Sequence, residues 1–302
     1  MDVMKISRSD RTFNLINGSI LLIFTLLMLY PLYFIIIASI SEPMAIVKGD
    51  VIIAPVDFQL TAYKNILQEP SIWIGYRNSI FYTSLGTFYN LALTIPAAYV
   101  ITKTELPGRN LLTWFFLITM FFSGGMIPTY LNMKNLGLLN TPWALIIGAG
   151  VSGWNLIITR EFFKNTIPTE IYESAHMDGA SEFRAFFNIA LPLSKPIIAV
   201  MALYYGVAHW NSYYSALLYV RKPDLFPLQL VLRNILISNE MSLAQALTEG
   251  DTSAIAVMVK KSYMVEAMKY SLIFIASFPL LCAYPFVQKY FVKGMMIGSV
   301  KG

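Results

Sequence analysis

Six stretches of this chain, each longer than 18 residues, contain no aspartate, glutamate, lysine or arginine. A helix of about 20 apolar residues crosses the hydrocarbon core of a bilayer. Lipid tolerates only helices or closed barrels as spanning structures, and these stretches lack the two-residue alternation that is typical of barrel strands. The pattern predicts an all-α membrane protein with six transmembrane helices, in residues 12–41, 78–102, 110–133, 135–159, 196–220 and 270–288.

The composition also favours a membrane protein. Hydrophobic residues make up 56% of the 302 residues and charged residues 13%, which is about half of the roughly 25% charge of a soluble domain. The net charge of +5 fits basic residues on the cytoplasmic side of a membrane better than a nucleic-acid partner. The single cysteine, Cys282, excludes an internal disulfide. His176 and His209 are widely separated and form no metal-binding motif, and His176 is interpreted as a surface residue.

The distribution of lysine and arginine predicts that both termini are cytoplasmic. With this orientation the inner segments hold 12 of the 22 basic residues. Basic residues are enriched on the cytoplasmic side mainly in short loops, so the two long outer segments do not count against this orientation. The expected organisation is a cytoplasmic tail at 1–13, a transmembrane domain at 14–291 with an inner loop at 160–195 and an outer loop at 221–269, and a cytoplasmic tail at 292–302.

The predicted helices contain nothing that would drive transport or catalysis by itself. Ion-coupled carriers bury carboxylates or cations at mid-membrane, and the six stretches hold none. The chain also lacks a G-x-x-x-x-G-K-[ST] phosphate-binding loop. Ser123-Gly124-Gly125 indicates helix packing or a break in a helix. An ion-coupled carrier and an intramembrane enzyme are therefore disfavoured alternatives, and the energy for transport is expected from a partner.

The inner loop at 160–195 carries the most specific pattern in the chain. Thr169 can cap a helix that ends at Gly179. Ser181 can cap a second short helix that ends before Pro192. The loop offers acidic and apolar side chains together, which suits docking into a groove of a partner protein.

Three ordered motifs in this loop resemble the E-A-A…G…I-x-L-P signature of the permease subunits of bacterial ABC importers. They are Glu173-Ser174-Ala175, Asp178-Gly179-Ala180 and Ile189-Ala190-Leu191-Pro192. Ser174 departs from the pattern, since alanine is usual there, but both residues are small. Residues 122–130, 206–218 and 293–302 resemble the carbohydrate subgroup of these permeases. The chain is similar to the maltose-type permeases, in the branch for complex oligosaccharides, which implies the fold of a type I ABC importer permease.

This resemblance implies one non-catalytic subunit of an oligosaccharide importer in the cytoplasmic (inner) membrane. A second homologous permease would complete a heterodimer, two ABC ATPase subunits would use ATP and Mg, and an extracytoplasmic sugar-binding protein would deliver the sugar. The chain itself would bind lipid but no cofactor, metal or nucleic acid. A permease for another solute, such as glycerol phosphate, is the alternative, although the spans hold no cation for a phosphate. The residues implied to couple alternating access to the ATPases are Glu173, Ser174, Ala175, Asp178, Gly179, Ala180, Ile189, Leu191 and Pro192.

Aromatic and polar residues of the fifth predicted helix form a candidate sugar path, because aromatic faces contact sugar C–H groups and polar groups contact hydroxyls. Aromatic belts at the membrane interfaces are the alternative explanation. The resemblance further implies that the outer loop at 221–269 contacts the binding protein and that the tail after Lys289 reaches the ATPases. The candidate path residues are Tyr204, Tyr205, His209, Trp210, Asn211, Tyr213 and Tyr214, with Asn90 and Asn155 from other predicted helices.

Overall fold

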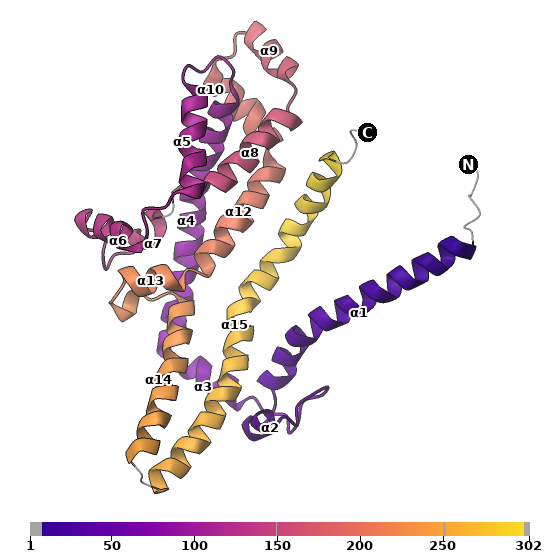
Figure 1. Cartoon of the computed structure of the whole chain (residues 1–302). Helices are drawn as coiled ribbons and strands as arrows, with labels where there is room; N and C mark the ends of the chain where they lie inside the picture. Colours follow the sequence, from indigo (N-terminus) through magenta and orange to yellow (C-terminus); the bar gives the residue numbers. More distant parts are fainter. Residues whose placement is uncertain (1–7, 149, 250–251, 299–302) are drawn as a thin grey trace. The chain divides into compact units, whose positions relative to one another are not determined.

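The computed structural model describes residues 8–148, 150–249 and 252–298. Within these ranges the regular structure is entirely helical, without a strand. The chain divides into two compact units, Met1–Glu69 with Ile235–Ser277 and Pro70–Asn234 with Phe278–Gly302. Figure 1 labels the helices of both units.

The first unit joins the end of α1 to α2, α3 and part of α15. Its core includes Ile37, Ala45 and Ala267. The ring of Phe34 packs edge-on against Tyr270, with the centroids 5.5 Å apart. Most apolar side chains of α1 are exposed within this unit, so they are available to contact lipid or a partner. The helices concerned are α1 (Arg8–Ser39), α2 (Pro43–Lys48), α3 (Thr61–Gln68), α14 (Leu228–Glu249) and α15 (Thr252–Gly298), of which α14 and α15 continue into the second unit.

The second unit is organised around α4, against which α8 and α12 pack. Helix α12 approaches α4 so closely that a Cβ atom on Gly86 would lie 2.5 Å from the ring of His209. Small residues at such crossings let membrane helices pack backbone to backbone. The remaining helices of this unit are short. The bounds are α4 (Pro70–Thr102), α5 (Arg109–Phe121), α6 (Met126–Asn135), α7 (Trp143–Ile147), α8 (Gly153–Thr166), α9 (Thr169–Met177), α10 (Glu182–Ala185), the π-helical η1 (Phe186–Ala190), α11 (Leu191–Leu193), α12 (Lys195–Trp210), α13 (Tyr213–Tyr219) and the 3-10 turn η2 (Pro223–Leu225).

Gly86→Ala is expected to destabilise the crossing of α4 and α12. The added methyl group would force the buried His209 ring to move, and overpacking of this kind costs about 1–3 kcal/mol. The thermal unfolding midpoint of the purified protein in detergent measures the effect. Gly206→Ala on α12 is the matched control, because its Cβ would meet no atom closer than 3.7 Å. Equal midpoints for the two variants would contradict the close approach.

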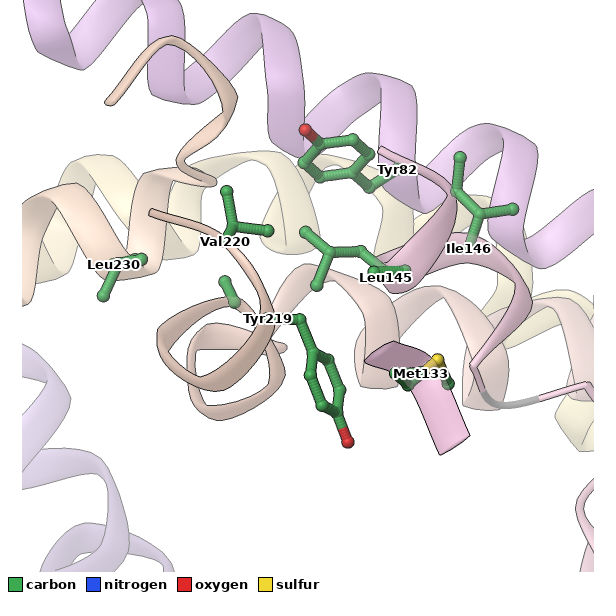
Figure 2. Packing of buried hydrophobic residues seen from close by; sticks show 9 residues of the cluster. Tyr82, Met133, Leu145, Ile146, Tyr219, Val220 and Leu230 are labelled. Atoms are coloured by element: carbon green, nitrogen blue, oxygen red, sulfur yellow. The ribbon is translucent and has the colours of Figure 1, made fainter. Parts of the chain in front are cut away.

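A buried cluster joins α4 to α7 and to the chain around α13 (Figure 2). Tyr82 of α4 lies across from Leu145 of α7, and Val220 follows α13. The Tyr82 hydroxyl donates to the carbonyl of Leu225 at 2.9 Å. A second buried cluster, which includes Phe186, joins α4 to α8 and η1. The two clusters hold the short helices at separate places along α4.

Three of the six uncharged stretches coincide closely with single long helices, and three do not. The described residues contain three helices long and apolar enough to span a membrane, within α1, α4 and α15. The stretch at 110–133 is divided between α5 and α6, which are bent by 116°. The stretch at 135–159 is divided between α7 and α8, and that at 196–220 between α12 and α13. Each of these three predicted spans is therefore divided between two helices rather than formed by one.

The breaks have local causes in the backbone. Gly125 precedes α6 with φ +85°, a conformation that glycine adopts without steric cost. The break indicated by Ser123-Gly124-Gly125 is thus present. Before α7, Gly137 and Asn140 have φ values of +68° and +60°, and asparagine is one of the few other residues that tolerate this region. Glycine and asparagine therefore interrupt sequences that are otherwise apolar enough to be helical.

The inner loop at 160–195 folds largely as its capping residues, glycine and proline predict, with two differences. Ser181 caps α10, since its Oγ accepts from the N–H of Arg184 at 3.4 Å. Thr169 is the first residue of α9 and Pro168 is its N-cap, so the predicted cap was one residue late. Pro192 does not end a helix but lies in the first turn of α11. The helix continues into α11 directly from the π-helical η1.

The segment predicted as a long outer loop, residues 221–269, is mostly helical. It contains α14 and the beginning of α15. Residues 228–249 include no glycine or proline and are rich in good helix formers. The prediction from uncharged stretches did not use this local signal. The predicted tail boundary at 292 falls inside α15, while residues 1–7 and 299–302 of the predicted tails lie outside the described residues.

Candidate functional site

Helices α9 and α10 lie at one end of the second unit and meet at a tight turn (Figure 1). Gly179 forms this turn with φ +77°. Its N–H donates to the carbonyl of His176, and the N–H of Ala180 donates to the carbonyl of Ala175, each at 2.9 Å. These bonds satisfy the last carbonyls of α9. The left-handed stop predicted at Gly179 is therefore present.

The motif residues of this region divide into exposed and supporting groups. Glu173, Ser174 and Asp178 are exposed, whereas Ala175 is buried. Leu191 packs against the buried cluster that contains Phe186. The remaining motif residues form the turn or the helical segment that leads to α12, namely Gly179, Ala180, Ile189 and Pro192. The acidic side chains are therefore exposed, while the apolar side chains of Ala175 and Leu191 pack inward and hold the segment in place.

Large apolar side chains are exposed beside the acidic ones. Met177 is 89% exposed, Phe183 78% and Phe187 55%. The rings of Phe183 and Phe187 stack with centroids 6.5 Å apart. The sequence interpretation did not single out these phenylalanines, although their spacing of four residues on a helix was a usable signal. Exposed apolar side chains in a group mark a contact surface, and we name Met177, Phe183 and Phe187 the apolar tip.

Glu182 connects three helices at the base of the apolar tip. Its carboxylate lies 3.0 Å from Lys103 Nζ and accepts from the Tyr99 hydroxyl at 3.1 Å. The other oxygen lies 3.1 Å from Nε2 of His176 on α9. Lys103 also lies 4.3 Å from the ring centroid of Tyr172. The end of α4, α9 and α10 are therefore fastened together, and His176, which is exposed as expected, also belongs to this cluster.

The charge on Glu182 depends on its neighbours. Partial burial acts to raise the pKa of the Glu182 carboxyl, but the hydrogen bond and charge of Lys103, with Tyr99 and His176, outweigh burial and lower the pKa. A carboxylate with a lowered pKa contributes stability that is present at neutral pH and is lost as pH falls through that pKa. The connection between α4 and α9 is therefore maintained at neutral pH.

A cavity of about 680 Å³ opens beside α9. Four basic residues line it: Lys103, Arg109, Arg160 and Lys164. Glu173 and Glu182 line it as well, so the cavity presents both signs of charge next to the motif. Such a mixture favours a charged protein surface as the occupant over a small apolar ligand.

The structure does not gather the candidate sugar-path residues on one surface. Tyr205, His209, Trp210 and Asn155 are buried, whereas Tyr204, Asn211, Tyr213 and Tyr214 are exposed. Of this set, Tyr205 and His209 line a cavity together with Asn90. Its volume is about 180 Å³, below the roughly 300–1,000 Å³ of ligand pockets. In this conformation the cavity is too small for an oligosaccharide.

Two pairs of buried polar side chains bind each other between α4 and α12. His209 Nε2 lies 2.7 Å from Asn90 Oδ1, and Asn90 Nδ2 donates to the carbonyl of Gly150 at 2.6 Å. The Tyr205 hydroxyl lies 2.7 Å from Thr94 Oγ1. Paired polar groups are the rule in interiors, because unpaired ones are costly. These bonds fasten α4 and α12 to the segment before α8.

Comparisons with known proteins agree with this architecture. Residues 71–296 match the family described as the binding-protein-dependent transport system inner membrane component. Protein LplC of Bacillus subtilis is 44% identical over 272 residues, which cover 90% of this chain and 89% of LplC. The polygalacturonan/rhamnogalacturonan transport system permease protein YtcP of the same organism is 38% identical over 293 residues, covering 97% and 99% of the two chains.

A solved structure is also similar. It is the crystal structure of a bacterial ABC transporter involved in the import of the acidic polysaccharide alginate. One of its chains is 34% identical to this one, with a TM-score of 0.82, and the match covers 94% of this chain and 98% of that one. This agreement supports the type I permease fold.

The chain belongs to the family of inner membrane components of binding-protein-dependent transport systems. The resemblance to carbohydrate ABC importer permeases that its motifs indicated is confirmed. It is a non-catalytic transmembrane subunit, and the family implies an ATPase and a substrate-binding protein as partners.

Proposed function

We propose that this chain is the permease subunit of an ATP-driven importer that moves oligosaccharides across the cytoplasmic membrane. The substrate class is supported by the likeness to a permease named for polygalacturonan/rhamnogalacturonan and to an alginate importer. The glycerol phosphate alternative has less support, because neither of these names points to it. A second, homologous permease would form the other half of the path, and two ABC ATPase subunits would use ATP and Mg.

The observation that carries the coupling mechanism is the connection through Glu182. The apolar tip and the exposed Glu173 and Asp178 would occupy a cleft of one ATPase. When the ATPases close on ATP, a push on α9 would reach α4 through Lys103, because Glu182 joins the two. Helices α4 and α12 would move together, since Asn90 and His209 bind each other. Rigid-body movement of packed helices is a known mode of switching.

For the topology we propose six crossings with both termini cytoplasmic. The crossings are α1, α4, the bent pair α5 and α6, the pair α7 and α8, α12 with α13, and α15. Basic residues at the α9 end of the second unit support this orientation, because they are enriched on the cytoplasmic side. The proposed organisation has the tails at 1–13 and 292–302 and the coupling loop at 160–195.

Single-cysteine labelling tests the orientation in a Cys282→Ser background. Asp178→Cys, at the α9 turn, is expected to react with an impermeant maleimide only after the cells are permeabilised. Lys222→Cys, after α13, is expected to react in intact cells. Both sites are exposed within this chain, and the permease is expressed without its ATPases so that docking does not cover position 178. The reverse pattern would contradict the proposed orientation.

Purification of the tagged chain from its native membranes in mild detergent tests the function. A second permease and an ABC ATPase are expected to purify with it, as identified by mass spectrometry. In proteoliposomes, the purified complex with its binding protein should take up oligosaccharides with ATP and without an ion gradient. Uptake driven by an ion gradient alone would instead support the secondary-carrier alternative.

A further inference from the structure

Another cavity lies in the part of the second unit that holds α6 and α13. It is lined in part by Tyr219, which belongs to the buried cluster around Tyr82. Tyr82 and Thr102 are both on α4, and a helix rises 1.5 Å per residue, so about 30 Å separates their levels. This distance matches the roughly 30 Å thickness of a bilayer core. With α9 in the cytoplasm, the cavity lies at the outer surface.

The lining combines aromatic rings with positive charge. The cavity has a volume of about 300 Å³, which is room for one sugar unit. The rings of Tyr130 and Tyr219 stack with centroids 6.3 Å apart and planes 23° apart. Lys134 and Arg221 line the same cavity. Within the described residues neither cation has an acidic partner, and no acidic residue lines the cavity.

The frame of the cavity is held by Asn140. Its N–H donates to the carbonyl of Tyr219 at 2.9 Å, and its Oδ1 accepts from the N–H of Arg221 at 2.6 Å. These bonds hold Asn140 at φ +60° and fix the turn after α6 against the end of α13. In Figure 2 the hydroxyl of Tyr219 points away from Leu145 and Val220. The groups that line the cavity are therefore positioned without a ligand.

We propose that this cavity is an outer subsite for an acidic sugar unit, with the carboxylate bound by Lys134 and Arg221. The C–H face of the sugar would lie on the tyrosine rings, and Asn140 would lie beside its hydroxyls. Hydrogen bonds from a cation to a carboxylate are shorter and stronger than neutral ones, so they select a uronic acid over a neutral sugar. The proposal rests on the proposed function and specifies its substrates as oligosaccharides that contain uronic acid units.

The test uses the complex with its partner permease, ATPases and binding protein in proteoliposomes. The probes are a short oligogalacturonate and its methyl ester, which has the same length without the charge. For Lys134→Gln and Arg221→Gln, the oligogalacturonate concentration that gives half-maximal uptake is expected to rise about tenfold. The value for the ester is expected to stay at that of the wild type. Lys222→Gln, a neighbouring cation that does not line the cavity, is the matched control.

Lys134→Arg keeps the charge and is expected to restore oligogalacturonate uptake, which separates loss of charge from misfolding. An equal loss for the acid and the ester would indicate contact with the binding protein and overturn the proposal. Uptake of neutral oligosaccharides but not oligogalacturonate by the wild type would overturn the proposal and leave the proposed function standing. Failure of the wild type to import any oligosaccharide with ATP would overturn both.

Discussion

Gly179→Val is expected to abolish ATP-driven import while leaving the permease folded in the membrane. Gly179 has φ +77°, where a residue with a Cβ atom is strained by roughly 1–2 kcal/mol and a β-branched one by more. No atom lies within 4 Å of the position that a Cβ would occupy, so the effect comes from the backbone rather than from a clash. A different turn would misdirect the apolar tip, the exposed residues Met177, Phe183 and Phe187. Uptake into proteoliposomes and the ATPase activity of the same complex are the measurements.

Gly179→Asn is the matched control, since asparagine tolerates the left-handed region better than other residues with a Cβ. It is expected to retain a large part of the uptake. If valine and asparagine reduced uptake equally, the side chain itself and not the turn conformation would be responsible. Unchanged uptake with valine would show that α9 does not transmit the movement.

The sequence predicts the helical fold well because its main signal is local. Uncharged stretches long enough for a bilayer identify α1, α4 and α15 directly. The breaks at Gly125 and Asn140 depend on more than composition. Asn140 holds its positive φ through bonds to Tyr219, the last residue of α13, and to Arg221 just after it, both far away in the sequence. Apolar length therefore predicts where helices form, whereas a positive-φ glycine at Gly125 and, at Asn140, tertiary contacts decide where they are interrupted.

The fold of the coupling loop at 160–195 was predictable in outline, because helix caps and turns depend on a few local residues. Ser181 and Gly179 act as their types indicate. The role of Glu182 was not predictable, because its partners Lys103 and His176 come from other parts of the chain. For the same reason, the pairing of His209 with Asn90 could not be distinguished from a sugar contact by residue type alone. Polar residues reveal their partners only in three dimensions.

Phe183→Glu is expected to release the ATPase from the permease. Phe183 is 78% exposed within this chain and stacks on Phe187, so it has the character of an anchor that a partner buries. Removing such an anchor costs about 2 kcal/mol or more, which is roughly thirtyfold in the dissociation constant. The amount of ATPase that purifies with the tagged permease measures this loss. Loss of the ATPase would also remove ATP-driven uptake.

Phe183→Leu is the control, because leucine keeps an apolar side chain at the same position and is expected to keep most of the ATPase bound. The thermal unfolding midpoint of the isolated permease should be the same for the wild type, Phe183→Glu and Phe183→Leu, since an exposed side chain contributes little to stability. Phe187→Glu is expected to repeat the loss, because the stacked ring supports Phe183. Full retention of the ATPase by Phe183→Glu would place the contact elsewhere and leave Glu173 and Asp178 as the residues to test next.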